Sequence, residues 1–180
     1  MKICVYCSAS EDLEKVFYEA GENFGKLIAE RGHGLVYGGY SKGVMASVAE
    51  AVYAGKGEIT AVVPDIFDRS GFTYEGCTEI IRTKTMAERK SAMENEADAI
   101  AILPGGIGTM DEFFSVFVLS TLGQYDRPVA VLNTAGFYDT LEKLLDEFVE
   151  KGFLSKDARD CAVFFKEPEK LIAYLENKDE

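Results

Sequence analysis

A glycine-rich stretch between two apolar runs constrains this sequence more than any other feature. Residues 99–103 have the length and composition of a buried parallel strand, and residues 113–119 are typical of a buried helix. Between them, the segment Leu-Pro-Gly-Gly-Ile-Gly-Thr-Met-Asp-Glu, which ends at Glu112, has three glycines in four positions. Because glycine lets the backbone turn tightly, this pattern predicts a strand, a tight turn and a helix, the repeating unit of α/β proteins.

The same alternation continues along the whole chain. Short apolar runs predict strands at residues 3–7, 35–37, 58–63, 78–81, 99–103, 128–132 and 161–165. Apolar residues at three-to-four spacing predict helices between them, with Thr85 as the cap of one helix and Pro168 as the start of the last. We therefore expect a Rossmann-like α/β fold, with a parallel sheet of about seven strands and helices on both faces. Residues 1–180 show no linker or repeat and predict a single domain.

The turn after residues 99–103 also predicts an anion site. Its exposed N–H groups and the positive end of the following helix form a cradle for a phosphate. Glu112 places a carboxylate within reach of whatever the phosphate is attached to. The same letters fit a capping box, in which Thr109 caps the helix and Glu112 bonds back to its N–H. A catalytic and a purely structural role for Glu112 both remain open at this point.

A second glycine-rich loop, Gly38-Gly-Tyr-Ser-Lys-Gly43, follows the strand expected at residues 35–37. Ligands of parallel α/β sheets bind at the carboxyl ends of strands where the strand order reverses, so both loops are expected to face one crevice. Neither loop has the G-x-G-x-x-G pattern of dinucleotide sites, which makes an NAD-dependent oxidoreductase the least favoured class. Residues 65–76 are polar and without period, and predict a rim loop or lid.

Two cations stand in the first turns of the helix that Thr85 is expected to cap. Arg89 and Lys90 there oppose the helix dipole, at a cost of a few tenths of a kcal/mol or more. A nearby anion removes this conflict, whereas two solvated surface side chains would simply tolerate it. Position alone does not decide between the two interpretations.

Charge and hydropathy exclude several classes of function. The net charge of −12 argues against nucleic-acid or anionic-membrane surfaces, which require a basic face. No segment has the roughly 20 apolar residues of a membrane span. The first seven residues are too short an apolar run for a signal peptide, so we expect a cytoplasmic protein.

Cysteine and histidine give little support for metal, redox or histidine-based catalysis. Cys4 and Cys7 have C-x-x-C spacing, but on a strand positions three apart point to opposite faces, and Cys77 and Cys161 are isolated. We expect four free thiols, no metal and no cofactor. His33 lies between two glycines in a turn and is expected to be solvated.

Three segments resemble the LONELY GUY (LOG) family, whose members often carry the label "possible lysine decarboxylase". They are Pro-Gly-Gly-Ile-Gly-Thr-Met-Asp-Glu at 104–112, Met-Ala-Glu-Arg-Lys at 86–90 and Tyr-Gly-Gly-Tyr-Ser-Lys-Gly-Val-Met at 37–45. The first matches the family's P-G-G-x-G-T-x-x-E and the second its M-x-x-R-K. Cys-Val-Tyr-Cys at 4–7 and Leu-Gly-Gln-Tyr-Asp-Arg-Pro at 122–128 are also similar, and the likeness covers most of the chain.

The resemblance implies a phosphoribohydrolase that cuts the N-glycosidic bond of a nucleoside 5′-monophosphate. The products are ribose 5-phosphate and a free base, which in this family is an N6-substituted adenine, a cytokinin. Glu112 and Arg89 are implied to be catalytic. The residues implied or expected to bind the substrate and its phosphate are Gly105, Gly106, Ile107, Gly108, Thr109, Lys90, Met86, Gly38, Gly39, Gly43 and Ser8. Family members are typically dimers with the site near the interface, which implies a homodimer.

The sequence departs from the family at three places. Tyr40 stands where many members have a third glycine, Arg69-Ser70 align with an Arg-Glu pair, and Val118-Leu119 replace Thr-Trp. The decarboxylase label has no support, because pyridoxal phosphate chemistry requires a lysine with an acidic partner for the ring nitrogen. The competing hypothesis is a non-catalytic carrier or sensor of a phosphorylated ligand, like the molybdenum-cofactor carriers that share this fold. Retention of Glu112 with Arg89 favours the enzyme.

Overall fold

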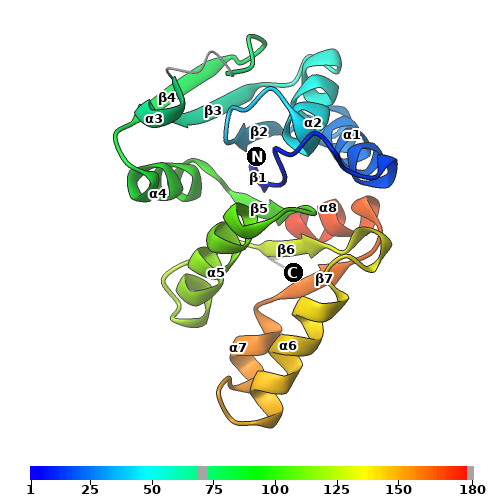
Figure 1. Ribbon diagram of the computed structural model, residues 1–180, viewed down its shortest axis with the longest axis vertical. Helices are drawn as coiled ribbons and strands as arrows, with labels where there is room; N and C mark the ends of the chain where they lie inside the picture. Colours follow the sequence, from blue (N-terminus) through cyan, green and yellow to red (C-terminus); the bar gives the residue numbers. More distant parts are fainter. Residues whose placement is uncertain (69–72, 178–180) are drawn as a thin grey trace.

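The computed structural model describes residues 1–68 and 73–177. Within these residues it contains one sheet of seven strands, all parallel, in the order β4-β3-β2-β1-β5-β6-β7 (Figure 1). This confirms the predicted fold class. The strands are β1 (Lys2–Tyr6), β2 (Gly34–Tyr37), β3 (Ile59–Pro64), β4 (Glu79–Thr83), β5 (Ala99–Ile102), β6 (Val129–Leu132) and β7 (Val163–Phe165).

Helices cover both faces of the sheet (Figure 1). One apolar core lies between the sheet and α1, α2 and α8, and a second lies between the sheet and α4, α5 and α6. The helices are α1 (Lys15–Glu30), α2 (Gly43–Ala54), α3 (Asp65–Asp68), α4 (Met86–Glu96), α5 (Ile107–Thr121), α6 (Asp139–Glu150), α7 (Lys156–Asp160) and α8 (Pro168–Glu176), with a 3₁₀ turn η1 (Thr134–Gly136).

β1 lies at the centre of the sheet because its sequence is a continuous apolar run. Its residues Ile3 to Tyr6 are at most 1% exposed, because a central parallel strand is covered on both faces. Cys4 packs into the core under α4 and α5, whereas Cys7 packs into the core under α1 and α2. The predicted opposite orientation of the two thiols is therefore confirmed, and all four cysteines are free.

The strand order places a crossover at the middle of the sheet. The chain moves outward from β1 through β2 and β3 to β4, and then returns to pair β5 with the other side of β1. The connections on the two sides of β1 and β5 diverge, so a crevice opens at the carboxyl ends of these strands. This is the topological position at which ligands bind in open α/β sheets.

Several local predictions need correction. The strand expected at residues 161–165 begins only at Val163, because the preceding residues form α7 and its end. Short α3 and η1 were also not anticipated, since elements of three or four residues leave no periodic pattern. His33 is not solvated: its ring is half-buried and Nε2 lies 2.8 Å from Oε1 of Glu176. The Arg69-Ser70 departure lies outside the described residues.

The predicted helix starts were partly right. Thr85 caps α4 as expected, and its hydroxyl accepts the N–H of Glu88 at 3.1 Å. Pro168 occupies the first turn of α8. The capping box at Thr109 is wrong, because Gly106 is the N-cap of α5 and Thr109 lies inside its first turn. Glu112 is therefore available for a different interaction.

Candidate active site

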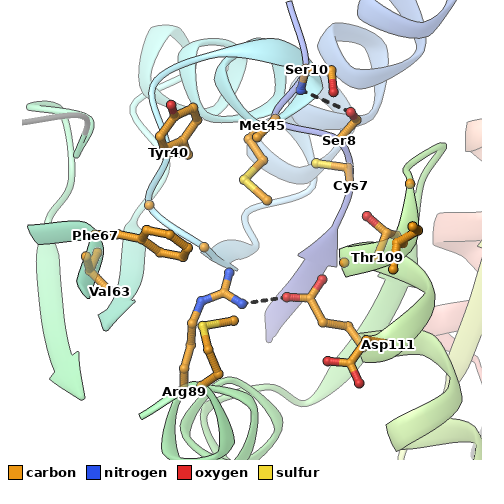
Figure 2. A pocket seen from close by; sticks show the side chains of 18 of the residues that line it. Cys7, Ser8, Ser10, Tyr40, Met45, Val63, Phe67, Arg89, Thr109 and Asp111 are labelled. Carbon is orange, nitrogen blue, oxygen red and sulfur yellow. Dashed lines mark hydrogen bonds and ion pairs between the residues drawn. The ribbon is translucent and has the colours of Figure 1, made fainter. Parts of the chain in front are cut away.

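A cavity of about 680 Å³ occupies the crevice at the carboxyl ends of β1, β2 and β5 (Figure 2). The loops that follow these three strands supply most of its wall, together with the starts of α4 and α5 and the segment after β3. Its lining consists of Cys7, Ser8, Ala9, Ser10, Gly38, Gly39, Tyr40, Met45, Val63, Phe67, Thr73, Met86, Arg89, Gly106, Ile107, Gly108, Thr109, Asp111 and Glu112. The two glycine-rich loops thus face the same space, as predicted.

The amino end of α5 forms one wall of the cavity. Gly106 is the N-cap, and the first intrahelical hydrogen bond runs from the N–H of Met110 to its carbonyl at 3.0 Å. The N–H groups of Ile107, Gly108 and Thr109 therefore precede the helical hydrogen-bond ladder and carry the positive end of the helix dipole. A Cβ atom on Gly106 or Gly108 would have no neighbour within 4 Å. This open wall of N–H donors suits an anion.

Gly105, although part of the same motif, faces the protein interior. Its N–H donates to the hydroxyl of Tyr138 at 3.1 Å. A Cβ atom at this position would overlap with the Thr109 side chain. The structure thus gives Gly105 a structural contact: its donor is already paired and it does not line the cavity, and its phosphate-binding role stays a prediction.

A buried ion pair crosses the floor of the cavity from α4 to α5. Nη1 of Arg89 donates to Oε1 of Glu112 at 2.6 Å, and each residue is only 5% exposed (Figure 2). Nε of Arg89 also donates to the carbonyl of Val62 at 3.3 Å. The interpretation of Arg89 as a solvated surface cation is therefore wrong. Removing one partner alone would leave an unpaired buried charge, which costs about 3–5 kcal/mol.

The electrostatic environment of Glu112 is set by two opposing effects. Burial raises the pKa of its carboxyl group above the ordinary glutamate value, and the positive charge of Arg89 opposes that rise without cancelling it. A carboxylate held in this way is poorly solvated. It can therefore interact strongly with positive charge that develops in a bound ligand.

Glycines in the loop after β2 make space for this pair. A Cβ atom on Gly38 would overlap with Nη2 of Arg89. Gly39 has a φ of 81°, and a Cβ atom there would lie 2.6 Å from the Val63 side chain. Gly43 has a φ of 63° and packs against the backbone of residues 8–10, outside the cavity lining. The structure thus shows Gly43 in the tight packing of α2 against the loop after β1, and its expected ligand role stays a prediction.

Lys90, Met86 and Ser8 are placed differently from one another. Nζ of Lys90 lies 3.0 Å from both carboxylate oxygens of Asp111, so this lysine joins α4 to α5 beside the Arg89 pair and does not line the cavity. Met86 and Ser8 do line it. The hydroxyl of Ser8 accepts the N–H of Ser10 at 3.1 Å, which shapes the loop after β1 (Figure 2).

The wall opposite α5 is largely apolar and was mostly missed. Tyr40, Met45 and Phe67 lie there, across the cavity from Thr109 (Figure 2). Phe67 belongs to α3, in the segment that showed no sequence period. The signal that could have found it is its position just after β3, because loops at carboxyl ends of strands converge on the crevice. Tyr40, a departure from the family pattern, stands directly at the cavity.

Two further findings concern the described part of the chain. Residues 1–68 and 73–177 contain no group of three or more His, Cys, Asp or Glu side chains arranged to hold a metal ion. Over the same ranges, every helix is too short or too polar to cross a membrane.

The fold and this site together define a Rossmann-like α/β protein with an open helix amino terminus in its cavity and an adjacent buried Arg–Glu pair. A family model described as "Possible lysine decarboxylase" matches residues 45–175. This chain belongs to that family, the LOG family. It is 37% identical over 175 residues to the probable cytokinin riboside 5′-monophosphate phosphoribohydrolase LOGL6 of Oryza sativa subsp. japonica, covering 97% of this chain and 70% of the relative.

A second relative and two solved structures are also similar to this chain. The cytokinin riboside 5′-monophosphate phosphoribohydrolase LOG2 of Arabidopsis thaliana is 36% identical, with 97% of this chain and 82% of the relative covered. Among solved structures, the molybdenum cofactor binding protein of Rippkaea orientalis superposes with a TM-score of 0.74 at 19% identity, covering 99% of this chain and 97% of that chain. The molybdenum cofactor carrier protein of Chlamydomonas reinhardtii gives 0.73, also at 19% identity, covering 97% and 95%. At this identity the structural likeness shows the fold alone.

Proposed function

We propose that this protein hydrolyses the N-glycosidic bond of a nucleoside 5′-monophosphate, releasing a free base and ribose 5-phosphate. The observation that carries the proposal is the buried Arg89–Glu112 pair in the same cavity as the open amino end of α5. The names of the relatives support the same class of reaction.

The chemistry follows from the charge that bond cleavage creates. When the bond between C1′ and the base nitrogen breaks, the electron pair leaves with the base and positive charge builds on the sugar. A carboxylate at Glu112 stabilises this charge, or orients the water molecule that adds to C1′. The water supplies a hydroxyl group to C1′ and a proton to the departing base, so the products balance.

The remaining residues position the substrate. The N–H groups at the start of α5 hold the phosphate, so that its binding energy fixes C1′ relative to Glu112. Arg89 keeps the neighbouring carboxylate ionised and in one orientation. This arrangement explains why an acidic protein can bind a nucleotide: the local donors act against the overall field.

For the base, we propose adenine or an N6-substituted adenine. The wall formed by Tyr40, Met45, Val63 and Phe67 offers an apolar surface for a purine ring and for an apolar N6 substituent. Phe67 lines the cavity and is 47% exposed. The phenol ring of Tyr40 takes up part of the space at this wall that a glycine would leave open.

The experiment is turnover of AMP and of N6-isopentenyl-AMP, with products separated by chromatography. We expect free base and ribose 5-phosphate from at least one nucleotide, and loss of both products in Glu112→Gln. Tight nucleotide binding without any turnover would contradict the proposal. It would favour the second candidate, a carrier of a phosphorylated ligand, which the structural likeness to molybdenum-cofactor carriers keeps in view. A carrier needs the N–H cradle but has no use for the buried acid.

We also propose that the protein is a homodimer that associates through α5. Phe114 and Val118 on α5 and Leu122 at its C-cap follow one another at four-residue spacing and are 36%, 51% and 65% exposed. Because each copy carries a net charge of −12, two copies approach best through an uncharged apolar surface such as this one. Light scattering of the wild type should give twice the mass of one chain. The Val118→Asp variant should have the mass of a single chain. A monomeric wild-type protein would refute this assembly.

A further inference from the structure

A buried phenol lies behind the phosphate-binding wall, outside the cavity. Tyr138, at the start of α6, is 3% exposed. Its hydroxyl accepts the N–H of Gly105 at 3.1 Å and donates to the carbonyl of Leu103 at 2.9 Å. One hydroxyl therefore spans both ends of the turn that leads from β5 to the N-cap of α5.

The phenol is itself held from the end of β6. Oδ1 of Asn133 accepts the backbone N–H of Tyr138 at 2.7 Å, and Nδ2 of Asn133 donates to Oδ1 of Asp139 at 2.7 Å. Asn133 is 2% exposed, and the 3₁₀ turn after it includes Ala135 at a φ of 53°, a conformation that non-glycine residues rarely adopt. Asn133, just after β6, and Asp139 of α6 thus hold this segment in one conformation, which places the Tyr138 hydroxyl at the turn before α5.

We infer that Tyr138 is a positioning residue for the phosphate-binding N–H groups of α5, an inference that rests on the function proposed above. The turn at residues 103–105 fixes the direction in which Gly106 begins the helix, and hence the direction of the free N–H groups that follow. Without the hydroxyl, the Gly105 N–H and the Leu103 carbonyl both lose their partner in a dry interior. The turn then shifts to recover hydrogen bonds, and the donors no longer converge on one anion.

The chemistry of the phenol suits this role. Burial raises the pKa of Tyr138 well above its ordinary value, so the hydroxyl keeps its proton, and with it the donor to Leu103, throughout the neutral range. The ring also packs edge-on against Phe137 with 4.8 Å between centroids. Phenylalanine at this position preserves the ring and removes only the hydroxyl.

The test measures binding of ribose 5-phosphate by calorimetry to Tyr138→Phe and to Tyr125→Phe. Tyr125 is the matched control, because it is also buried but lies between α5 and β6 at the amino ends of the strands, away from the cavity. We expect the dissociation constant to rise about three- to tenfold in Tyr138→Phe, the loss of a net hydrogen bond, and to stay unchanged in Tyr125→Phe. In turnover, KM should rise by a similar factor while kcat changes less.

Asp139 gives a second route to the same answer. Asp139→Ala removes the carboxylate that orients Asn133 and should weaken ribose 5-phosphate binding, as Tyr138→Phe does. Asp139→Asn keeps an oxygen acceptor for Asn133, and its affinity for ribose 5-phosphate should stay close to that of the wild type. Unchanged ribose 5-phosphate affinity in Tyr138→Phe, together with a lower melting temperature, would overturn the inference and leave a merely structural tyrosine. Because calorimetry needs no turnover, a wild-type protein that binds ribose 5-phosphate without hydrolysing nucleotides would refute the proposed function alone.

Discussion

The two glycine-rich loops look alike in sequence but use glycine for opposite purposes. At the start of α5, a Cβ atom on Gly106 or Gly108 would meet nothing within 4 Å, and only the preceding Gly105 is packed against the protein, at Thr109. In the loop after β2, a Cβ atom on Gly38 or Gly43 would overlap with Arg89 or with the backbone of residues 8–10. The first loop keeps space for a ligand, and the second is filled by the protein itself.

This difference divides the site into two kinds of wall. The α5 side presents N–H donors and the Glu112 carboxylate, and its residues are expected to act on the ligand. The β2 side supplies shape, because its glycines let the guanidinium of Arg89 and the start of α2 approach the strands closely. Substitutions on the α5 side should therefore change activity or affinity, and substitutions on the β2 side should change stability or the geometry of the ion pair.

The largest effect is expected for Glu112→Gln. The amide keeps the size of the side chain but removes the negative charge, so we expect the turnover rate to fall about 10²–10³-fold, or ~3–4 kcal/mol in the barrier. The same change leaves the Arg89 guanidinium buried without its counter-charge, so the free energy of unfolding should fall as well, and turnover is compared on protein that circular dichroism shows to be folded. Hydrolysis of AMP or N6-isopentenyl-AMP, followed by base release, measures this. Glu94→Gln is the matched control, since Glu94 is also a buried carboxyl on α4 but does not line the cavity. Equal losses in the two variants would contradict a specific role for Glu112.

The next largest effect is expected for Gly43→Ala, on the shape-forming side. The backbone has a φ of 63°, and the added Cβ would lie 2.5–2.8 Å from backbone atoms of residues 8–10. Left-handed strain and the clash together should lower the free energy of unfolding by about 3 kcal/mol. Urea unfolding followed by circular dichroism measures this. A stability equal to wild type would show that this loop, too, has room to spare.

Gly38→Ala should produce an intermediate effect and act on both properties. The new methyl group would occupy the place of Nη2 of Arg89, whose guanidinium cannot simply move because it bonds to Glu112 and to the Val62 carbonyl. We expect turnover to fall about tenfold to a hundredfold, or ~2 kcal/mol, with the sheet intact. Activity and melting temperature, measured on the same preparation, separate the effect on turnover from the effect on stability. Full activity would mean that the ion pair tolerates displacement.

The residues expected to contact the ligand were easier to predict from the sequence than the buried contacts that hold them in place. Residue pattern and spacing located both loops, and the fold then brought Arg89 and Glu112 together from positions 23 residues apart in the chain. The inward direction of Gly105 and the anchoring by Tyr138 were not predictable, because they depend on how β6 and α6 pack against the turn after β5. Phe67 was missed for a related reason: a four-residue helix leaves no period, and its role comes only from its place in the crevice.

A smaller effect on the turnover rate is expected on mild acidification. The rate should fall by up to about tenfold for each pH unit below the pKa of Glu112. Burial raises the pKa of Glu112 above its value in the unfolded chain, so the ionised form that the reaction needs is lost at a higher pH than for an ordinary glutamate. The turnover rate should fall as the pH drops through this raised pKa. The contribution of Glu112 to stability should not fall with it, because the folded state binds this proton more tightly than the unfolded state and is favoured by protonation below the folded pKa. Rates of the wild type, and its melting temperature relative to that of Glu112→Gln, test the two statements across about pH 4–8, a range that begins near the ordinary glutamate pKa of about 4.3 and extends above it.

The smallest effect on stability, and the sharpest contrast between the loops, is expected for Gly108→Ala. Alanine has a higher helix propensity than glycine, and its Cβ would meet no neighbour, so the free energy of unfolding should rise by up to about 1 kcal/mol. The methyl group would nonetheless occupy space next to the N–H groups of α5, and binding of ribose 5-phosphate should weaken. A variant that is more stable and binds less well identifies glycine there as a ligand requirement. If affinity is unchanged, the open space beside Gly108 is not where the phosphate lies, and the anion must be bound further along the cavity, toward Ser8 and Ser10.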